Sequence, residues 1–327
     1  MRDLLTDYER LSATGPVGRA VVTSVWGSAP RLAGASLLAT AEGLMAGSVS
    51  GGCVEGAVVE AIGAAIRAGR PHMVRFDVSH EQAWAVGLAC GGSIEVLVEP
   101  AVRPELLEAA RGPGGVVVAS VVGGPLPLGR PDPSLAGPIA DALPQVLASR
   151  ESRTVAMPSS AGEVSVFLEV YPEQEHLLII GAVHVAEVLA RLARPLGYRV
   201  IVADGRAAFL TRERFPDADL LLEAWPAEAF AQAGVTGATS ICVLTHDPKF
   251  DEPALELALR SPARYIGAIG SRRTQAERRE RLRASGFGDA DLERIHGPIG
   301  LDLGGRHPAE IALAILAEMT AAKYGKG

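Results

Sequence analysis

The sequence predicts an α/β protein with two domains: an N-terminal α+β domain over residues 1–172 and a C-terminal domain with a doubly wound parallel sheet over residues 176–327. Three observations lead to this fold class. The chain has 327 residues, enough for two domains that each bury a core. Its apolar patterning changes near residue 172. Beyond that point short apolar runs alternate with helical patterns, as they do in parallel sheets.

The N-terminal domain is predicted from short valine-rich runs that glycine and proline interrupt. Runs of this length are typical of strands, and they cover residues 21–25, 36–39, 94–98, 116–121 and 164–170. A strong helical pattern begins at Val54 and ends before Gly69, with its apolar residues on one face. Residues 126–144 are rich in proline and glycine, so we expect a loop there.

The C-terminal domain is predicted from a second set of apolar runs, which look like buried strands and cover residues 177–180, 199–203, 220–222, 240–244 and 265–268. Helical patterns separate most of these runs. Strands that alternate with helices in this way imply a parallel sheet with helices on both faces. The polar segment 171–176 separates the two halves of the chain.

Charge and hydropathy exclude several classes of function. The formal net charge of −7 argues against a general nucleic-acid binder. The first residues lack the apolar run of a signal peptide, and no stretch reaches the ~18 uninterrupted apolar residues of a membrane span. We therefore expect a cytoplasmic protein without nucleic-acid or membrane partners. In that compartment its three cysteines remain thiols.

Two cysteines lie in glycine-rich turns with nearly mirrored sequences, Ser50-Gly51-Gly52-Cys53 and Cys90-Gly91-Gly92-Ser93. Glycine removes side-chain bulk beside a thiol and frees the backbone, so that amide N–H groups and sulfur can approach one ligand. If a helix starts at the first of these sequences, Cys53 lies in its first turn, where the helix dipole lowers the pKa of a thiol. The resulting thiolate binds soft metals or attacks electrophiles.

Other interpretations of these residues stay open. Glu55, in the same helical turn, is a further candidate ligand contact, and the alternative is that it stabilises the helix start through the dipole. For Cys90 the alternative is a tight turn into the strand at 94–98. The cysteine spacing does not supply the ligands of a structural zinc site. A Cys–His nucleophile with His80 as the base is a minor hypothesis. Cys242 lies inside an apolar run and is expected to be a small core residue.

The turn after the first C-terminal run is similar to a dinucleotide-binding turn and departs from it at one position. Gly181-Ala182-Val183-His184-Val185-Ala186 keeps the first glycine and the final small residue of the G-x-G-x-x-A pattern. Val183 replaces the glycine on which a pyrophosphate would rest. Asp204 keeps the place of the acid that binds ribose. We predict a Rossmann-like domain with Gly181, His184 and Asp204 as candidate ligand contacts, and with NAD(P) binding as an alternative.

Further polar residues follow the later apolar runs of this domain, where open α/β sheets bind ligands. His246 and Asp247 follow the fourth run, and a carboxylate at the end of a central strand is costly to bury without a purpose. Ser271 is expected to cap a helix whose N-terminus, with Arg272 and Arg273, would suit a phosphate. The alternative is a solvated helix start, because this helix is basic along its length.

These turns belong to a longer series of motifs, which lie at Gly27-Ser28-Ala29-Pro30-Arg31 and at residues 47–55, 89–96, 181–186, 245–247, 265–272 and 296–304. In this order they closely resemble the xanthine dehydrogenase accessory family, XdhC/CoxI, and the resemblance spans nearly the whole chain. The family's dinucleotide-like turn usually reads G-A-G-H-V-A. Val183 is a departure that weighs against a nucleotide at this turn.

The resemblance implies an accessory protein rather than an enzyme. Members of the family bind the molybdenum cofactor (molybdopterin) as cargo and hold it while a partner cysteine desulfurase or sulfurtransferase installs its terminal sulfido ligand. They then deliver it to an apo molybdenum hydroxylase such as xanthine dehydrogenase. The two cysteine turns of the family carry over to Cys53 and Cys90. A homo-oligomer stays open, and the alternative function is an NAD(P)-dependent oxidoreductase that uses the C-terminal domain.

Together these residues predict one binding site. The thiols of Cys53 and Cys90, with the neighbouring glycine amides, would contact the anionic metal end of the cofactor. Its phosphate would bind Arg31, or the helix start at residues 271–273 if the two domains face each other. We expect the pocket in the cleft between the domains, because ligand sites favour domain interfaces.

Overall fold

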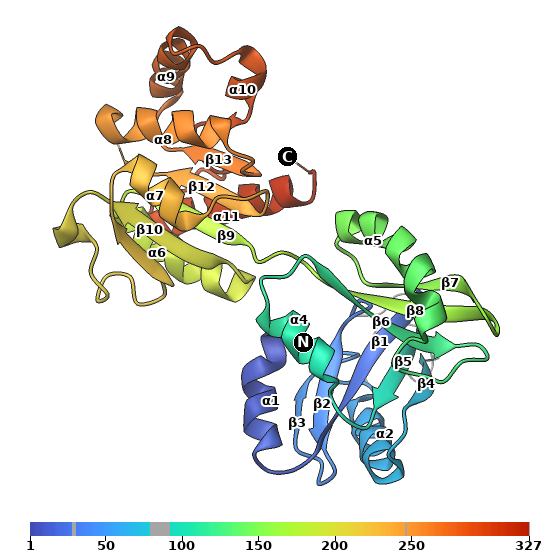
Figure 1. Ribbon diagram of the computed structural model, residues 1–327. Helices are drawn as coiled ribbons and strands as arrows, with labels where there is room; N and C mark the ends of the chain where they lie inside the picture. Colours follow the sequence, from blue (N-terminus) through green and yellow to red (C-terminus); the bar gives the residue numbers. More distant parts are fainter. Residues whose placement is uncertain (28–30, 79–91, 246, 327) are drawn as a thin grey trace. The chain divides into compact units, whose positions relative to one another are not determined.

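The structure, a computed structural model, describes residues 1–27, 31–78, 92–245 and 247–326. The chain divides into two compact units, Met1–Glu173 and Gln174–Gly327, and the boundary falls inside the polar segment at 171–176 (Figure 1). Each unit has its own sheets, its own covering helices and its own buried apolar clusters.

The first sheet of the N-terminal unit has, among the described residues, five antiparallel strands in the order β3-β2-β1-β5-β4. They are β1 (Val17–Gly27), β2 (Ser36–Thr40), β3 (Met45–Gly47), β4 (His72–Val78) and β5 (Gly92–Glu99). The helix α2 (Glu55–Ala68) packs on this sheet, because Val58 and Ile62 lie in one apolar cluster with Val22 and Val96. It ends at Gly69 in the left-handed conformation, as the sequence predicts.

The N-terminal segment and one further helix complete this half of the unit. The segment forms the short η1 (Arg2–Leu4) and α1 (Leu5–Ser12), and α4 (Pro104–Arg111) follows β5. Leu11 of α1 and Leu106 of α4 are fully buried in a shared apolar cluster. Strands β3 and β4 are additional to the predicted ones. β3 is too short to give a pattern, and its residues are exposed or half-buried.

The second sheet of this unit has the order β6-β8-β7 and consists of β6 (Val116–Gly123), β7 (Arg153–Ser159) and β8 (Gly162–Tyr171). The loop expected at residues 126–144 is wrong for its second half, which forms η2 (Pro133–Leu135) and most of α5 (Ala136–Ser149). Leu135 and Val146 are buried against β8, and this packing outweighs the loss of one backbone hydrogen bond at Pro144.

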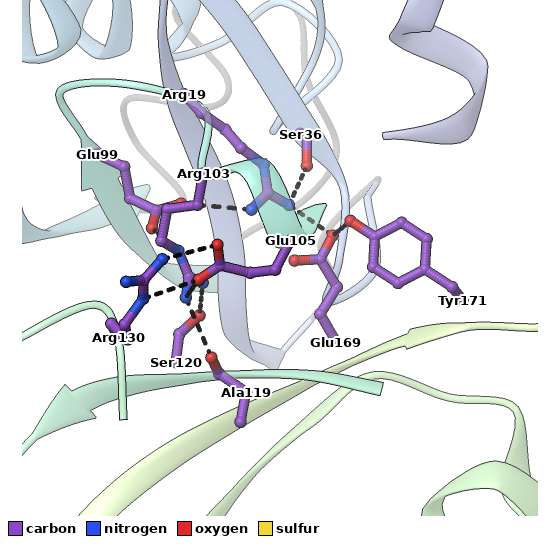
Figure 2. Close-up of polar contacts among 10 residues, drawn as sticks. All are labelled: Arg19, Ser36, Glu99, Arg103, Glu105, Ala119, Ser120, Arg130, Glu169 and Tyr171. Atoms are coloured by element: carbon purple, nitrogen blue, oxygen red, sulfur yellow. Dashed lines mark hydrogen bonds and ion pairs between the residues drawn. The ribbon is translucent and has the colours of Figure 1, made fainter. Parts of the chain in front are cut away.

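A buried ion network joins the two sheets of the N-terminal unit, as Figure 2 shows. The guanidinium of Arg19 on β1 is fully buried and donates to Glu169 on β8 over 2.5 Å and to Glu99 on β5 over 3.4 Å. Burial alone would lower the pKa of Arg19, but the two carboxylates raise it, so the guanidinium stays charged. Arg103 reaches Glu99 over 2.8 Å from the start of α4, and the hydroxyl of Tyr171 donates to Glu169.

The C-terminal unit contains the predicted parallel sheet. Its strand order is β11-β10-β9-β12-β13-β14, and every pairing is parallel. This is the strand order 3-2-1-4-5-6 of a Rossmann domain, so the predicted fold class is confirmed. The strands are β9 (His176–Ile180), β10 (Arg199–Asp204), β11 (Leu220–Glu223), β12 (Thr239–Val243), β13 (Tyr265–Ala268) and the two-residue β14 (Ile295–His296).

Helices cover both faces of this sheet (Figure 1). One face packs against α7 (Pro226–Ala233) and α8 (Pro248–Arg260), and the other packs against α6 (His184–Ala193) and α11 (Pro308–Lys323). The remaining helical segments of the described residues are η3 (Arg194–Leu196), η4 (Ala207–Phe209), α9 (Arg272–Ala284) and α10 (Asp289–Glu293). The carboxyl ends of the parallel strands therefore meet at one edge, where the loops that follow β9, β10, β12, β13 and β14 begin.

Candidate functional site

The carboxylate of Glu55, the first residue of α2, is the centre of the loop Ser48–Val54. It accepts hydrogen bonds from the hydroxyls of Ser48 (2.6 Å) and Ser50 (2.5 Å). Backbone amides also donate to it over 2.9–3.2 Å, and they belong to Val49, Ser50, Gly51, Gly52 and Val54. The loop is thus an anion-binding nest of amide groups, and the anion is a side chain of the same chain.

Two glycines make this convergence feasible. Gly51 and Gly52 have φ angles of +85° and +121°, a conformation that residues with a side chain rarely adopt. Burial alone would raise the pKa of Glu55, but the hydrogen bonds from Ser48 and Ser50 lower it to about 2. The carboxylate is therefore ionised at neutral pH. The amides of Gly51 and Gly52, expected to face a ligand, already have this acceptor.

Cys53 is the outward-facing group of the loop. Its side chain is exposed, and its amide donates to the hydroxyl of Ser50 over 3.0 Å. The expectation that Cys53 lies in the first helical turn is wrong, because Val54 is the N-cap and α2 begins at Glu55. The helix starts late because the chain must first bring its amides around the carboxylate of Glu55. The group of this turn that is available to a ligand is therefore the Cys53 thiol, on a loop that Glu55 holds in place.

The second cysteine turn lies mostly outside the described residues, which include neither Cys90 nor Gly91. Gly92 is the first residue of β5 and pairs with Gly27 at the end of β1 and with Val78 at the end of β4. Arg31 is exposed in the segment between β1 and β2. That the two thiols share one pocket stays a prediction.

The turn after β9 packs too tightly for any residue but glycine at its first position. Gly181 has a φ of +106°, and a Cβ atom there would lie 2.3 Å from Cγ2 of Thr245, two residues beyond the end of β12. Val183 is the N-cap of α6. His184 begins the helix with a mostly exposed imidazole, whose Nδ1 lies 3.7 Å from a carboxylate oxygen of Glu187.

Asp204, predicted at the ribose-binding position, lies at the end of β10 and is 1% exposed. Its carboxylate accepts from the amide of Ala182 over 2.9 Å and from Nε and Nη2 of Arg206 over 2.8 and 2.7 Å. Burial would raise the pKa of Asp204, but these hydrogen bonds lower it. A ribose hydroxyl would have to displace Arg206 to reach this acid, so the turn is a poor fit for a dinucleotide.

Asp247 does not have the buried position that the sequence suggested. It is exposed, and its carboxylate caps α8 by accepting from the amide of Lys249 over 3.0 Å. The buried acid of this region is Asp251, one helical turn later, which pairs with Arg278 of α9 over 2.9 Å and bonds to the hydroxyl of Thr245. Sequence reasoning missed Asp251 because it lies inside a helix. His246 lies outside the described residues.

The three residues at the start of α9 have different roles. The hydroxyl of Ser271 accepts from the amide of Thr274 over 3.2 Å, so it caps the helix as predicted. Arg273 forms an exposed ion pair with Glu277 over 2.9 Å. Arg272 lines a cavity of about 370 Å³ in the C-terminal unit. Only Arg272 of this group is placed to meet a ligand in that cavity.

Comparison with known proteins gives matches in both units. Residues 11–77 match a family model described as the XdhC and CoxI family, and residues 177–319 match one described as the XdhC Rossmann domain. A Bacillus subtilis (strain 168) protein, named as a probable subunit of xanthine dehydrogenase, is 30% identical over 308 residues, which are 92% of this chain and 91% of that protein. This chain belongs to the XdhC and CoxI family.

A second relative of this XdhC and CoxI protein is named molybdenum cofactor insertion chaperone PaoD, from Escherichia coli (strain K12). It is 26% identical over 309 residues, covering 94% of this chain and 84% of PaoD. A crystal structure titled as a xanthine dehydrogenase from Bacillus halodurans superposes with a TM-score of 0.69 at 23% identity. The superposition covers 98% of this chain and 96% of the other, and it shows the same fold.

In this XdhC and CoxI chain the remaining cysteine of the described part is a core residue, as predicted. Cys242 on β12 is fully buried, with its Sγ 3.9 Å from Sδ of Met319, and burial raises its pKa. The described residues hold no group of three or more His, Cys, Asp or Glu side chains placed to bind a metal ion. None of their helices is long and apolar enough to span a bilayer.

Proposed function

We propose that this protein carries the molybdenum cofactor as cargo and delivers it to an apo molybdenum hydroxylase, without catalysing a reaction of its own. Membership of the XdhC and CoxI family supports the proposal, as does the relative named as a molybdenum cofactor insertion chaperone. The single structural observation that carries it is the exposed thiol of Cys53 on a loop held by an internal carboxylate. Such a thiol is a contact group that needs no reorganisation to meet a ligand.

The chemistry of this thiol fits the proposed cargo. Sulfur is a soft donor and suits the metal end of a pterin dithiolene, whereas a buried thiol such as that of Cys242 has no access to it. The amides around Cys53 already donate to Glu55 and Ser50, so the sulfur of Cys53, rather than a backbone donor, is the group of this loop that would contact the cofactor. Cys90 is proposed as the second sulfur contact.

The proposal includes a partner that modifies the cargo. A cysteine desulfurase or other sulfurtransferase would install the terminal sulfido ligand while the cofactor is held, and a xanthine dehydrogenase-like apo-enzyme would then receive it. Holding the cargo by sulfur and by its phosphate leaves the terminal ligand free to be exchanged. We place this exchange in the cytoplasm, where thiols stay reduced.

Copurification tests the cargo proposal. The full chain is produced in cells that make molybdopterin, and bound molybdenum and pterin are measured in the purified protein. Cys53→Ala is expected to lose most of both, and Cys242→Ala, a matched control that removes a buried thiol, is expected to keep them. A Cys53→Ala protein that folds normally and retains the full amount of molybdenum and pterin would show that this thiol does not hold the cofactor.

A further inference from the structure

The cavity beside Arg272 is a separate feature of the C-terminal unit. It has a volume of about 370 Å³ and lies between the start of α9, the loop at 297–306 that follows β14, and the first turns of α11. It opens at the carboxyl edge of the parallel sheet, where Rossmann domains bind their ligands. Neither Gly181 nor Asp204 lines it, so it is distinct from the dinucleotide-like turn.

Two guanidinium groups without acceptors lie at this cavity. Arg272 and Arg306 both line it, and neither side chain has a hydrogen-bond or ion-pair partner among the residues that the structure describes. The neighbouring arginines differ. Each has an acceptor, and these are Arg273, Arg278, Arg279, Arg281, Arg283 and Arg294. Guanidinium groups without a paired acceptor are therefore concentrated at the cavity rather than spread along α9.

The loop at 297–306 adds backbone donors. The amides of Asp302, Gly304 and Gly305 donate to no acceptor within the described part of the chain. Gly304 has a φ of +79°, and a Cβ atom there would meet nothing within 4 Å, so its backbone borders open space. Free amides close together in a glycine-rich loop suit an anion, and those of Gly304 and Gly305 are adjacent.

Two acids also line the cavity, and within the described residues neither is paired with the guanidinium of Arg272 or Arg306. Glu310 lines it, but its carboxylate accepts from the amides of Arg306 and His307 over 3.0 and 2.9 Å, and these bonds lower its pKa. It thereby caps the start of α11 and offsets the partial positive charge there, while its carboxylate stays ionised. Asp302 is the other lining acid, and it remains as a local negative charge that a bound anion would have to tolerate.

Apolar side chains supply the rest of the lining. Leu301 and Leu303 are 41% and 57% exposed although they are large and apolar, and Ile299 and Ile311 lie beside them. Exposed leucines next to free guanidinium groups indicate a ligand with an apolar or planar part and an anionic end. The guanidinium fork matches the oxygens of a phosphate better than a point charge does.

We infer that this cavity binds an organic phosphate: Arg272, Arg306 and the loop amides hold the phosphate, and Leu301 and Leu303 contact the apolar or planar group attached to it. The inference does not depend on Cys53. The phosphate has two potential sources, the phosphate end of the pterin cargo and a free organic phosphate such as a nucleotide. Both present the same chemistry to the cavity.

Calorimetric titration of the full chain tests the site. The probes are guanosine 5′-monophosphate and phenyl phosphate, with guanosine as the probe that lacks the phosphate. We expect both phosphates to bind and guanosine to bind at least about tenfold more weakly. Binding of neither phosphate at millimolar concentration, or equal affinity for guanosine and its monophosphate, would overturn the inference.

Four variants locate the binding. Arg272→Gln and Arg306→Gln are each expected to weaken the phosphates by about tenfold, and Asp302→Asn is expected to strengthen them by removing a like charge. Arg273→Gln is the matched control, because the guanidinium of Arg273 lies next to Arg272 in the sequence but is already paired with Glu277. The affinity of this variant for both phosphates is expected to be unchanged. If Arg272→Gln and Arg306→Gln bind as the unchanged protein does, the site is not here.

The source of the phosphate is decided by cargo content. If the cargo's phosphate occupies the cavity, Arg272→Gln and Arg306→Gln purify with less pterin, and a loaded chain no longer binds guanosine 5′-monophosphate. If a free organic phosphate is the ligand, these variants keep their pterin and Cys53→Ala keeps its nucleotide affinity. Failure of the cargo proposal, seen in Cys53→Ala, is thus separable from failure of this site.

Discussion

Glu55 occupies, with its own carboxylate, the place in the loop Ser48–Val54 that a bound anion would take in other nests. This changes the meaning of the Gly-Gly-Cys motif. Its glycines bend the backbone around a side chain of the same helix, and they do not hold their amides open for a ligand. The motif is therefore a support for one thiol, and Glu55 is the residue that fixes it.

The carboxylate of Glu55 gives a pH-dependent prediction. Its pKa in the folded chain is about 2, below the ordinary 4.5, so its stabilising effect is present above pH 4.5 and is lost as the pH falls toward 2. We expect Glu55→Gln to lower the free energy of unfolding by about 2 to 3 kcal/mol at pH 7. The difference from the unchanged protein should shrink in urea unfolding at pH 3. A difference that stays constant between these pH values would refute the assignment.

The thiols give a second prediction at this scale. Cys53 is exposed and Cys242 is fully buried in the parallel sheet. In the native protein, iodoacetamide should modify Cys53 readily and should modify Cys242 only after unfolding. Peptide mapping by mass spectrometry measures both sites in one sample. Comparable labelling of Cys242 in the native state would mean that β12 is not sealed as described.

Among elements, the contact between the two N-terminal sheets depends on a buried cation. Replacing Arg19 with methionine leaves Glu169 on β8 with only the Tyr171 hydroxyl, while Glu99 keeps Arg103 (Figure 2). An unpaired buried carboxylate costs about 3 to 5 kcal/mol, so we expect Arg19→Met to lower stability by that amount. Arg10→Met, which removes an exposed pair with Asp7, should change stability by less than about 1 kcal/mol in the same denaturation experiment.

The elements that sequence patterns predict best are those whose pattern and packing agree. The buried apolar runs of the C-terminal unit all form strands, because a parallel sheet covered on both faces needs continuous apolar residues. The helix α5 was missed because two prolines and a glycine suggest a loop, and only its burial against β8 shows otherwise. The predicted start of α2 is too early, because the loop before it first brings its backbone amides to the carboxylate of Glu55. No hydrophobic periodicity reveals such hydrogen bonds.

The candidate site was harder to predict than the fold. The sequence indicates the exposed Cys53 and the cap at Ser271, since both follow from local motifs. It does not indicate the pairing of Asp204 with Arg206, because side-chain conformation decides which acceptor a nearby guanidinium takes. Nor does it indicate the cavity that Arg306 shares with Arg272, because those residues come from separate segments of the chain. Residue types at strand ends predict where a site lies but not which of their charges remain unpaired.

At the scale of the whole molecule, a Rossmann sheet coexists with a turn that does not suit a dinucleotide. Val183 stands where the motif has a glycine, and Asp204 is bonded to Arg206 and to the amide of Ala182. We therefore expect no binding of NAD(H) or NADP(H) at this turn. Arg272→Gln, in which the separate phosphate cavity is weakened, should show none at millimolar concentration when the full chain is titrated by calorimetry. A dissociation constant below about 100 μM would revive an oxidoreductase as the function.

The loop around Glu55 has a consequence for how its thiol can be reused. Every donor to that carboxylate lies within the seven residues that precede it, so the closing of the loop requires no distant strand to be in place. Segment 48–68, the loop and the helix together, therefore contains all the hydrogen bonds to Glu55 that fix the loop carrying Cys53. Transplanted onto an unrelated scaffold that covers its buried apolar side chains, Val49, Val58 and Ile62, it should still present the sulfur of Cys53 to solvent.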